Sequence, residues 1–166
     1  MTERKLIEGK RILIVDDELD VLDTVEELLS GCSVVRASSF EEAKNLLMNE
    51  YFDMAILDIM GVEGYKLLDI ANQRKVTAVM LTAHALSPED TAKSYNEGAA
   101  FYVPKDEMAN IKVYLNDILE AEREGKSPWS RWFMRFGTFY EKRFGPDWQE
   151  KDKSFWDKFR ERYKTW

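Results

Sequence analysis

Short apolar runs that end abruptly at polar residues alternate along this sequence with segments of helical periodicity. The run at 12–15 ends at Asp16-Asp17, and the run at 54–57 ends at Asp58. The pattern predicts further strands at 34–35, 76–81 and 101–103, and helices at about 22–30, 39–49, 65–73, from 87 onward, and 111–122. Nearly continuous apolar strands are typical of a parallel sheet that helices cover on both faces. We therefore expect an α/β fold of five strand–helix pairs.

The chain divides into two parts of different composition near residues 124–128, where a Gly and a Pro interrupt the helical pattern. Residues 1–122 carry a net charge of −12 and residues 123–166 a net charge of +5. All five tryptophans and six of the nine phenylalanines lie in the second part. We expect an α/β domain at 1–123 and a helical, aromatic and basic tail at 124–166.

The composition excludes several classes of protein. Hydrophobic residues make up 45% of the chain, which is enough for a packed core. The single cysteine, Cys32, excludes an intrachain disulfide. The sequence has no run of about 20 apolar residues that could span a bilayer, and its charged start lacks the apolar stretch of a secretory signal. These features predict a cytoplasmic protein.

The polar residues that follow four of the strands are expected to meet at one edge of the sheet, beyond the carboxyl ends of the strands. They are Asp16-Asp17, Asp58, Thr82 and Lys105. Carboxylates held close together repel one another unless a cation neutralises them, and Mg²⁺ prefers such oxygen ligands. Asp58 is then a candidate nucleophile that forms an aspartyl-phosphate. Taken alone, an Asp after a strand is more often a turn or helix-cap residue, and the conjunction of four strand ends favours the site.

Four segments, ILIVDDELD, AILDIM, VMLTAHA and FYVPKD, resemble in order and spacing the signatures of response-regulator receiver domains. The resemblance covers about residues 10–123. It implies a flavodoxin-like (βα)5 fold, a doubly wound parallel sheet with strand order 2-1-3-4-5. It also implies a Mg²⁺-dependent reaction in which a sensor histidine kinase or a phosphotransfer protein supplies the phosphoryl group.

The resemblance assigns roles to individual residues of the expected site. Asp58 matches the phosphoacceptor. Asp17 matches the direct metal ligand, and Asp16 its acidic partner. The main-chain carbonyl of Met60, two residues past the acceptor, matches a further metal ligand.

Three further matches concern the response to phosphorylation. Thr82 matches the switch hydroxyl, Tyr102 the aromatic residue that is drawn inward, and Lys105 the lysine that pairs with the phosphoryl group.

The sequence departs from the family pattern at two places. The loop from Asp58 to Gly64 is shorter than usual and lacks proline, and Asp106 follows the lysine where a cis proline is common. Because a cis non-proline bond is unfavourable by about 2.5–4 kcal/mol, we expect Lys105–Asp106 to be trans. The single histidine, His84, fits a loop residue better than a phosphodonor.

Aromatic residues recur at helical spacing in two stretches of the tail, which predicts two amphipathic helices separated by Gly145-Pro146. The first stretch has Trp129, Trp132, Phe133, Phe136 and Tyr140, and the second has Trp148, Phe155, Trp156, Phe159 and Tyr163. We expect the tail to pack on its own receiver or across a homodimer, with Trp132 and Trp156 as anchors. A regulated surface for a partner protein is the next alternative, and binding to a membrane or a nucleic acid is the least favoured.

The sequence thus predicts a response regulator that is phosphorylated at Asp58 and is not a turnover enzyme. A Mg²⁺-dependent phosphatase with an aspartyl-phosphate is one alternative. It is disfavoured because such haloacid-dehalogenase-like enzymes place a DxD after the first strand, where this chain has adjacent aspartates. The other alternative is a receiver-like scaffold that takes no phosphate. The five family positions at the site are all filled, by Asp16, Asp17, Asp58, Thr82 and Lys105, which disfavours it.

Overall fold

The computed structural model describes residues 6–82 and 88–144, and for Pro88 and residues 138–144 it describes the backbone alone. Strands and helices alternate along these residues as predicted. In chain order they are β1 Arg11–Val15, α1 Leu19–Leu28, β2 Ser33–Ala37, α2 Phe40–Asn49, β3 Met54–Asp58, α3 Gly64–Gln73, β4 Thr77–Thr82, α4 Pro88–Asn96, β5 Phe101–Pro104, a 3-10 helix Lys105–Asn110, α5 Ile111–Arg123 and α6 Pro128–Phe144. His84, Gly145-Pro146 and the second aromatic stretch with Trp156 lie outside the described residues.

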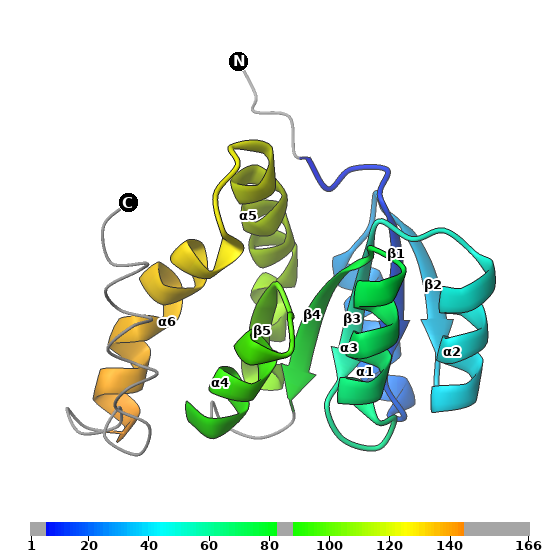
Figure 1. Cartoon of the computed structure of the whole chain (residues 1–166), viewed down its shortest axis with the longest axis horizontal. Helices are drawn as coiled ribbons and strands as arrows, with labels where there is room; N and C mark the ends of the chain where they lie inside the picture. The colour runs from blue at the N-terminus through cyan, green and yellow to red at the C-terminus, as the bar shows by residue number, and fades with distance from the viewer. Residues whose placement is uncertain (1–5, 83–87, 145–166) are drawn as a thin grey trace.

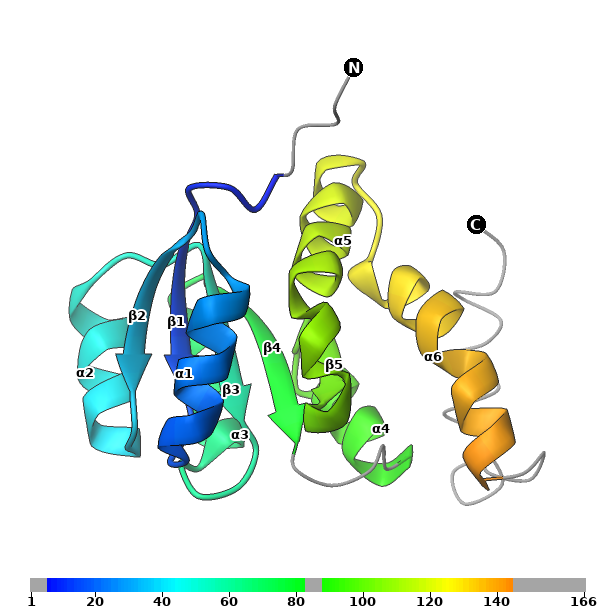
Figure 2. The same ribbon diagram turned by 180° about the vertical axis from the view of Figure 1, so that it is seen from behind.

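The five strands form one parallel sheet in the order β2-β1-β3-β4-β5, which confirms the predicted topology. Helices α1 and α5 cover one face, and α2, α3 and α4 cover the other (Figures 1 and 2). All residues of β3 are buried because this strand lies in the middle of the sheet between the two helical layers. The carboxyl ends of the strands therefore meet at one edge of a rigid core.

Local capping explains where two helices begin. Ser39 accepts a hydrogen bond from the Glu42 amide at 3.2 Å, and the Glu42 carboxylate accepts one from the Ser38 amide rather than from that of Ser39. Helix α4 begins at Pro88, whose missing amide hydrogen leaves no donor unsatisfied in a first turn. The 3-10 helix that starts at Lys105 was not predicted, since its six residues carry no apolar periodicity.

Helix α6 packs beside β5, which is the last strand of the sheet, and beside α4 and α5 (Figure 2). Trp129, Trp132 and Phe136 are buried in this contact, and Phe133 is partly buried. Packing of these four residues on their own receiver, anchored by Trp132, is therefore confirmed, and the side chain of Tyr140 lies outside the described residues. Packing across a homodimer and the domain boundary at 123/124 stay predictions. Within the described residues, none of the helices combines the length and apolar character that crossing a bilayer requires.

Candidate functional site

The polar residues predicted to converge lie at the carboxyl ends of neighbouring strands. Asp58 is the last residue of β3, and the register with β4 places Thr82 one residue further along. Thr82 in turn pairs with Pro104, directly before Lys105. Asp16 follows β1, on the other side of β3. Asp16, Asp58 and Thr82 are all buried, so the strands hold these polar groups at the rim of the core.

Lys105 is the cation of this cluster. Its ammonium nitrogen lies 2.9 Å from a carboxylate oxygen of Asp16, 3.0 Å from one of Glu18 and 3.5 Å from one of Asp58. Burial alone would lower the pKa of Lys105, but the hydrogen bonds to Asp16 and Glu18 outweigh it and raise that pKa above its ordinary value. Lys105 is therefore protonated, and its closest partners are Asp16 and Glu18.

Two carboxyl groups of the cluster, those of Asp58 and Asp16, have a pKa above the ordinary value. The pKa of Asp58 is raised to about 7, chiefly by burial and next by the charge of Asp16, while Lys105 opposes both. Burial also raises the pKa of Asp16, although the hydrogen bond from Lys105 lowers it in part. One lysine therefore does not neutralise this group of carboxylates, and a further cation would favour their ionised forms.

Glu18 belongs to the acidic cluster, although the motifs did not single it out. Oxygen atoms of Asp16, Asp17 and Glu18 lie within 4.8 Å of one another. The Glu18 amide also donates to the Asp16 carboxylate at 2.9 Å, which orients that side chain. Asp17 and Glu18 are exposed and Asp16 is buried, so the group opens toward solvent. A third carboxylate directly after Asp16-Asp17 was the signal that could have revealed it.

The loop between β3 and α3 passes directly over the carboxylates. Gly61 has φ +82°, and a Cβ atom on it would meet the Asp17 carboxylate at 2.5 Å, so this position requires glycine. A Cβ atom on Gly64 would collide with the Asp58 main-chain carbonyl. The short loop predicted from the sequence is therefore tightly packed. Met60 lies in it with an exposed side chain, and the metal-binding role of its carbonyl stays a prediction.

Tyr102 lies in β5 with a fully buried side chain, in the strand against which α6 packs. The indole nitrogen of Trp132 donates to the Tyr102 carbonyl at 3.0 Å, and that of Trp129 donates to the Ala99 carbonyl at 2.8 Å. Each bond joins residues that are 30 positions apart. Sequence spacing identified the aromatic stripe of α6 but not these main-chain partners, because a helical repeat shows which side chains share a face and not what that face contacts.

Ion pairs join helix α6 to helix α5. Arg135 donates to both oxygens of Asp117 on α5, at 2.8 and 3.2 Å. Arg131 reaches Asp117 at 3.4 Å and Glu120 at 3.2 Å. Asp117 is almost fully buried, and a buried carboxylate requires such partners. The basic tail therefore meets acidic groups of the receiver, which agrees with the opposite net charges of the two parts.

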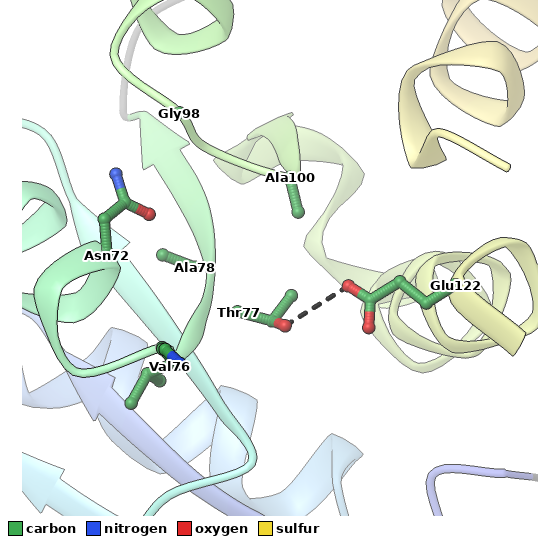
Figure 3. A pocket seen from close by; sticks show the side chains of 8 residues that line it. Asn72, Val76, Thr77, Ala78, Gly98, Ala100 and Glu122 are labelled. Carbon is green, nitrogen blue, oxygen red and sulfur yellow. Dashed lines mark hydrogen bonds between the residues drawn. The ribbon is translucent and has the colours of Figure 1, made fainter. Parts of the chain in front are cut away.

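Figure 3 shows a cleft of about 270 Å³ that lies away from the carboxylate cluster. It is lined by residues at the start of β4, the end of α3 and the end of α5. Glu122 supplies a carboxylate there, and Thr77 donates a hydrogen bond to it at 3.2 Å. Because this cleft is at the amino end of β4, it is not part of the site formed by the carboxyl ends of the strands.

Comparison with known proteins identifies this architecture. The family model described as "Response regulator receiver domain" matches residues 12–116, which include every residue of the cluster. The chain belongs to the response-regulator receiver family. The match ends before the tail, so α6 lies outside the part that the family model describes.

Curated relatives of this receiver are response regulators from several organisms. The chain is 38% identical over 122 residues to the "Probable transcriptional regulator ycf27" of Guillardia theta, covering 68% of this chain and 48% of that protein. It is 40% identical over 103 residues to the alginate biosynthesis transcriptional regulatory protein AlgB of Pseudomonas aeruginosa, covering 57% of this chain and 22% of that protein. The receiver therefore spans less than half the length of these relatives.

Solved structures place the receiver among proteins of the same fold. A CheY-like receiver domain protein from Methanospirillum hungatei is 33% identical, with a TM-score of 0.57, and the match covers 70% of this chain and 99% of that one. The response regulator DrrB of Thermotoga maritima is 26% identical, with a TM-score of 0.60, covering 69% of this chain and 54% of that one. Both matches leave about 30% of the present chain uncovered.

Proposed function

We propose that this receiver is a response regulator whose Asp58 accepts a phosphoryl group from a sensor histidine kinase or a phosphotransfer protein. The observation that carries the proposal is the gathering of Asp58, Asp16 and Lys105 at one strand edge, with Lys105 within 4 Å of both carboxylates. Such a site modifies its own side chain once and then signals. The protein therefore acts as a switch and not as a turnover enzyme.

The proposed reaction is a direct displacement at phosphorus. A carboxylate oxygen of Asp58 forms a bond to phosphorus while the bond from phosphorus to the donor atom breaks, and the donor atom keeps that electron pair. Lys105 then turns from Glu18 toward the new phosphoryl group, and the Thr82 hydroxyl donates to one of its oxygens. Because Tyr102 lies in β5 between these residues and α6, it carries the change to the tail.

The site has the ligands that Mg²⁺ prefers. Asp16, Asp17 and Glu18 offer carboxylate oxygens within 4.8 Å of one another, and the required glycine at position 61 leaves room beside Asp17. We assign Asp17, Asp16, Asp58 and the Met60 carbonyl as the groups that hold the ion. Bound there, Mg²⁺ would supply the positive charge that keeps Asp58 ionised and offsets its repulsion of an incoming phosphoryl group.

Labelling with acetyl phosphate tests the proposal. The wild-type protein should gain one phosphoryl group in the presence of Mg²⁺ and none in EDTA, as measured by intact mass. Asp58→Asn should abolish the gain, whereas Asp69→Asn, at an exposed position of α3, should not. Stoichiometric labelling of Asp58→Asn would show that the acceptor is another residue. A wild-type protein that never labels would favour the receiver-like scaffold.

A further inference from the structure

Strand β5 joins the acidic cluster to helix α6. Its residue Tyr102 accepts the hydrogen bond from the Trp132 indole at 3.0 Å. Three residues later Lys105 lies between Asp16 and Glu18. Tyr102 and Trp132 are both fully buried, so neither side chain can turn without displacing its neighbours. The position of this short strand is therefore set from both ends, by the carboxylates and by α6.

The contact of α6 with this region is extensive and rigid. Trp129 donates to the Ala99 carbonyl just before β5, and its ring stacks on Phe101 with centroids 6.4 Å apart. Phe136 packs against Phe101 and Tyr114 at 6.1 and 5.4 Å. Two indole hydrogen bonds to main-chain carbonyls fix the backbone itself, which ring contacts alone would not do. Docked α6 thus restrains the segment that leads into Lys105.

Phosphorylation would change the forces on the other end of β5. Lys105 is closer to Glu18, at 3.0 Å, than to Asp58, at 3.5 Å. A phosphoryl group adds about 1.5 to 2 negative charges at neutral pH, and it would attract Lys105 away from Glu18. The segment that carries Lys105 follows directly on β5, so its movement strains the contacts that α6 makes with that strand. A ligand shifts an equilibrium only through contacts that differ between the two states, and the pairing of Lys105 with Glu18 is the contact that would differ.

We infer that docked α6 stabilises the arrangement in which Lys105 pairs with Glu18, so that docking of α6 and phosphorylation of Asp58 oppose each other. The inference rests on the proposed function of Asp58. Coupling between two sites is reciprocal. Phosphorylation therefore loosens α6, and loosening α6 promotes phosphorylation. Release leaves Asp117 on the surface of α5, where water replaces Arg131 and Arg135 as its partners.

Hydrogen exchange on the full chain tests the first direction. With Mg²⁺ and beryllofluoride, a phosphoryl mimic, amides in peptides covering residues 129–137 should exchange faster than with Mg²⁺ alone. Asp58→Asn should remove this response. Peptides from α2 serve as an internal control and should not change, because α2 lies at the edge of the sheet opposite to α6 (Figure 1).

Two matched tryptophan variants test the reverse direction. Trp132→Phe keeps an aromatic ring but loses the bond to Tyr102, and Trp129→Phe loses the bond to Ala99 instead. Allosteric coupling commonly changes an equilibrium about 5- to 150-fold. We expect Trp132→Phe to tighten the equilibrium binding of beryllofluoride in Mg²⁺ about five-fold or more, as measured by titration calorimetry, and Trp129→Phe to tighten it less. Arg135→Gln, which loosens α6 without altering its aromatic face, should also tighten this binding, and it covers the case in which Trp132→Phe does not fold.

The outcomes separate this inference from the proposed function. If wild-type Asp58 labels normally while exchange in α6 is unchanged or slower with beryllofluoride, the inference is wrong and the proposed function stands. Equal beryllofluoride affinities of Trp132→Phe, Arg135→Gln and wild type would also overturn it. If wild-type Asp58 does not label at all, the proposed function fails and the inference fails with it.

Discussion

At the scale of single residues, Lys105 interacts with three carboxylates of different exposure. Asp16 and Asp58 are buried, and Glu18 has a side chain that is 59% exposed. An ion pair with an exposed partner contributes about 0–1 kcal/mol. Glu18 therefore restrains Lys105 only weakly, which suits a contact that is exchanged when a stronger anion forms nearby.

Glu18→Gln should increase the phosphorylated fraction that acetyl phosphate gives at an early time point. The reason is that Lys105 loses its competing partner and pairs more readily with the phosphoryl group. An exposed pair of about 0–1 kcal/mol corresponds to an increase of at most about five-fold. Glu27→Gln, at an exposed position of α1, the helix that follows Glu18, is the matched control. A decrease in labelling with Glu18→Gln would instead make Glu18 part of the metal site.

The raised pKa of Asp58 predicts how stability depends on pH. The folded protein binds the Asp58 proton with a pKa of about 7, against an ordinary value of 3.8, chiefly because the carboxyl is buried and next because of Asp16. The folded state holds more protons than the unfolded state between these values, so this group lowers the free energy of unfolding as pH rises from about 4 to about 7.

In EDTA at pH 8, Asp58→Asn should therefore unfold at a higher urea concentration than wild type. Its free energy of unfolding should be larger by a few kcal/mol, because one pKa unit corresponds to about 1.4 kcal/mol. Below about pH 4 the difference should largely vanish, because the wild-type carboxyl is then protonated. Urea unfolding curves at several pH values measure this. A variant that is less stable than wild type at pH 8 would contradict the raised pKa.

At the scale of elements, α6 offers a direct comparison between Trp132, a fully buried large side chain, and Met134, an exposed apolar one. Trp132→Ala should lower the free energy of unfolding by about 3–5 kcal/mol, the usual effect of removing a large buried aromatic side chain. Met134→Ala, at a position that is 50% exposed, should change it by at most about 0.5 kcal/mol. Denaturation of the two variants measures the difference, and similar losses would show that α6 does not stay docked in solution.

The same elements show what a sequence can and cannot predict. The strands and their order followed from short apolar runs and from the receiver motifs, because burial on both faces leaves a clear local pattern. The 3-10 helix at Lys105 left none. The bonds from Trp132 to Tyr102 and from Lys105 to Glu18 were also not predicted, since they depend on how α6 and the strand ends meet in three dimensions.

At the scale of the whole molecule, α6 is an additional element, because the family model matches the receiver at residues 12–116 and does not include this helix. Removing residues 128–166 should uncover Phe101 and Tyr114 on the receiver, both of which now contact the rings of α6. We expect a lower melting temperature and stronger binding of an apolar dye than in the full chain. A chain that ends at Phe144 keeps α6 and isolates its contribution. Equal melting temperatures for the chain that ends at Phe144 and the chain that ends at Ser127 would contradict a stabilising α6.

The position of α6 beside the last strand has a further consequence for a concentrated solution. An edge strand presents unpaired main-chain groups to which a strand of another molecule can add, and natural proteins commonly cover such edges. The indole of Trp132 occupies the Tyr102 carbonyl on β5, and the body of α6 lies across that side of the sheet (Figure 1). The helix therefore protects β5 from intermolecular strand pairing, and molecules with α6 released are the ones from which aggregation would start.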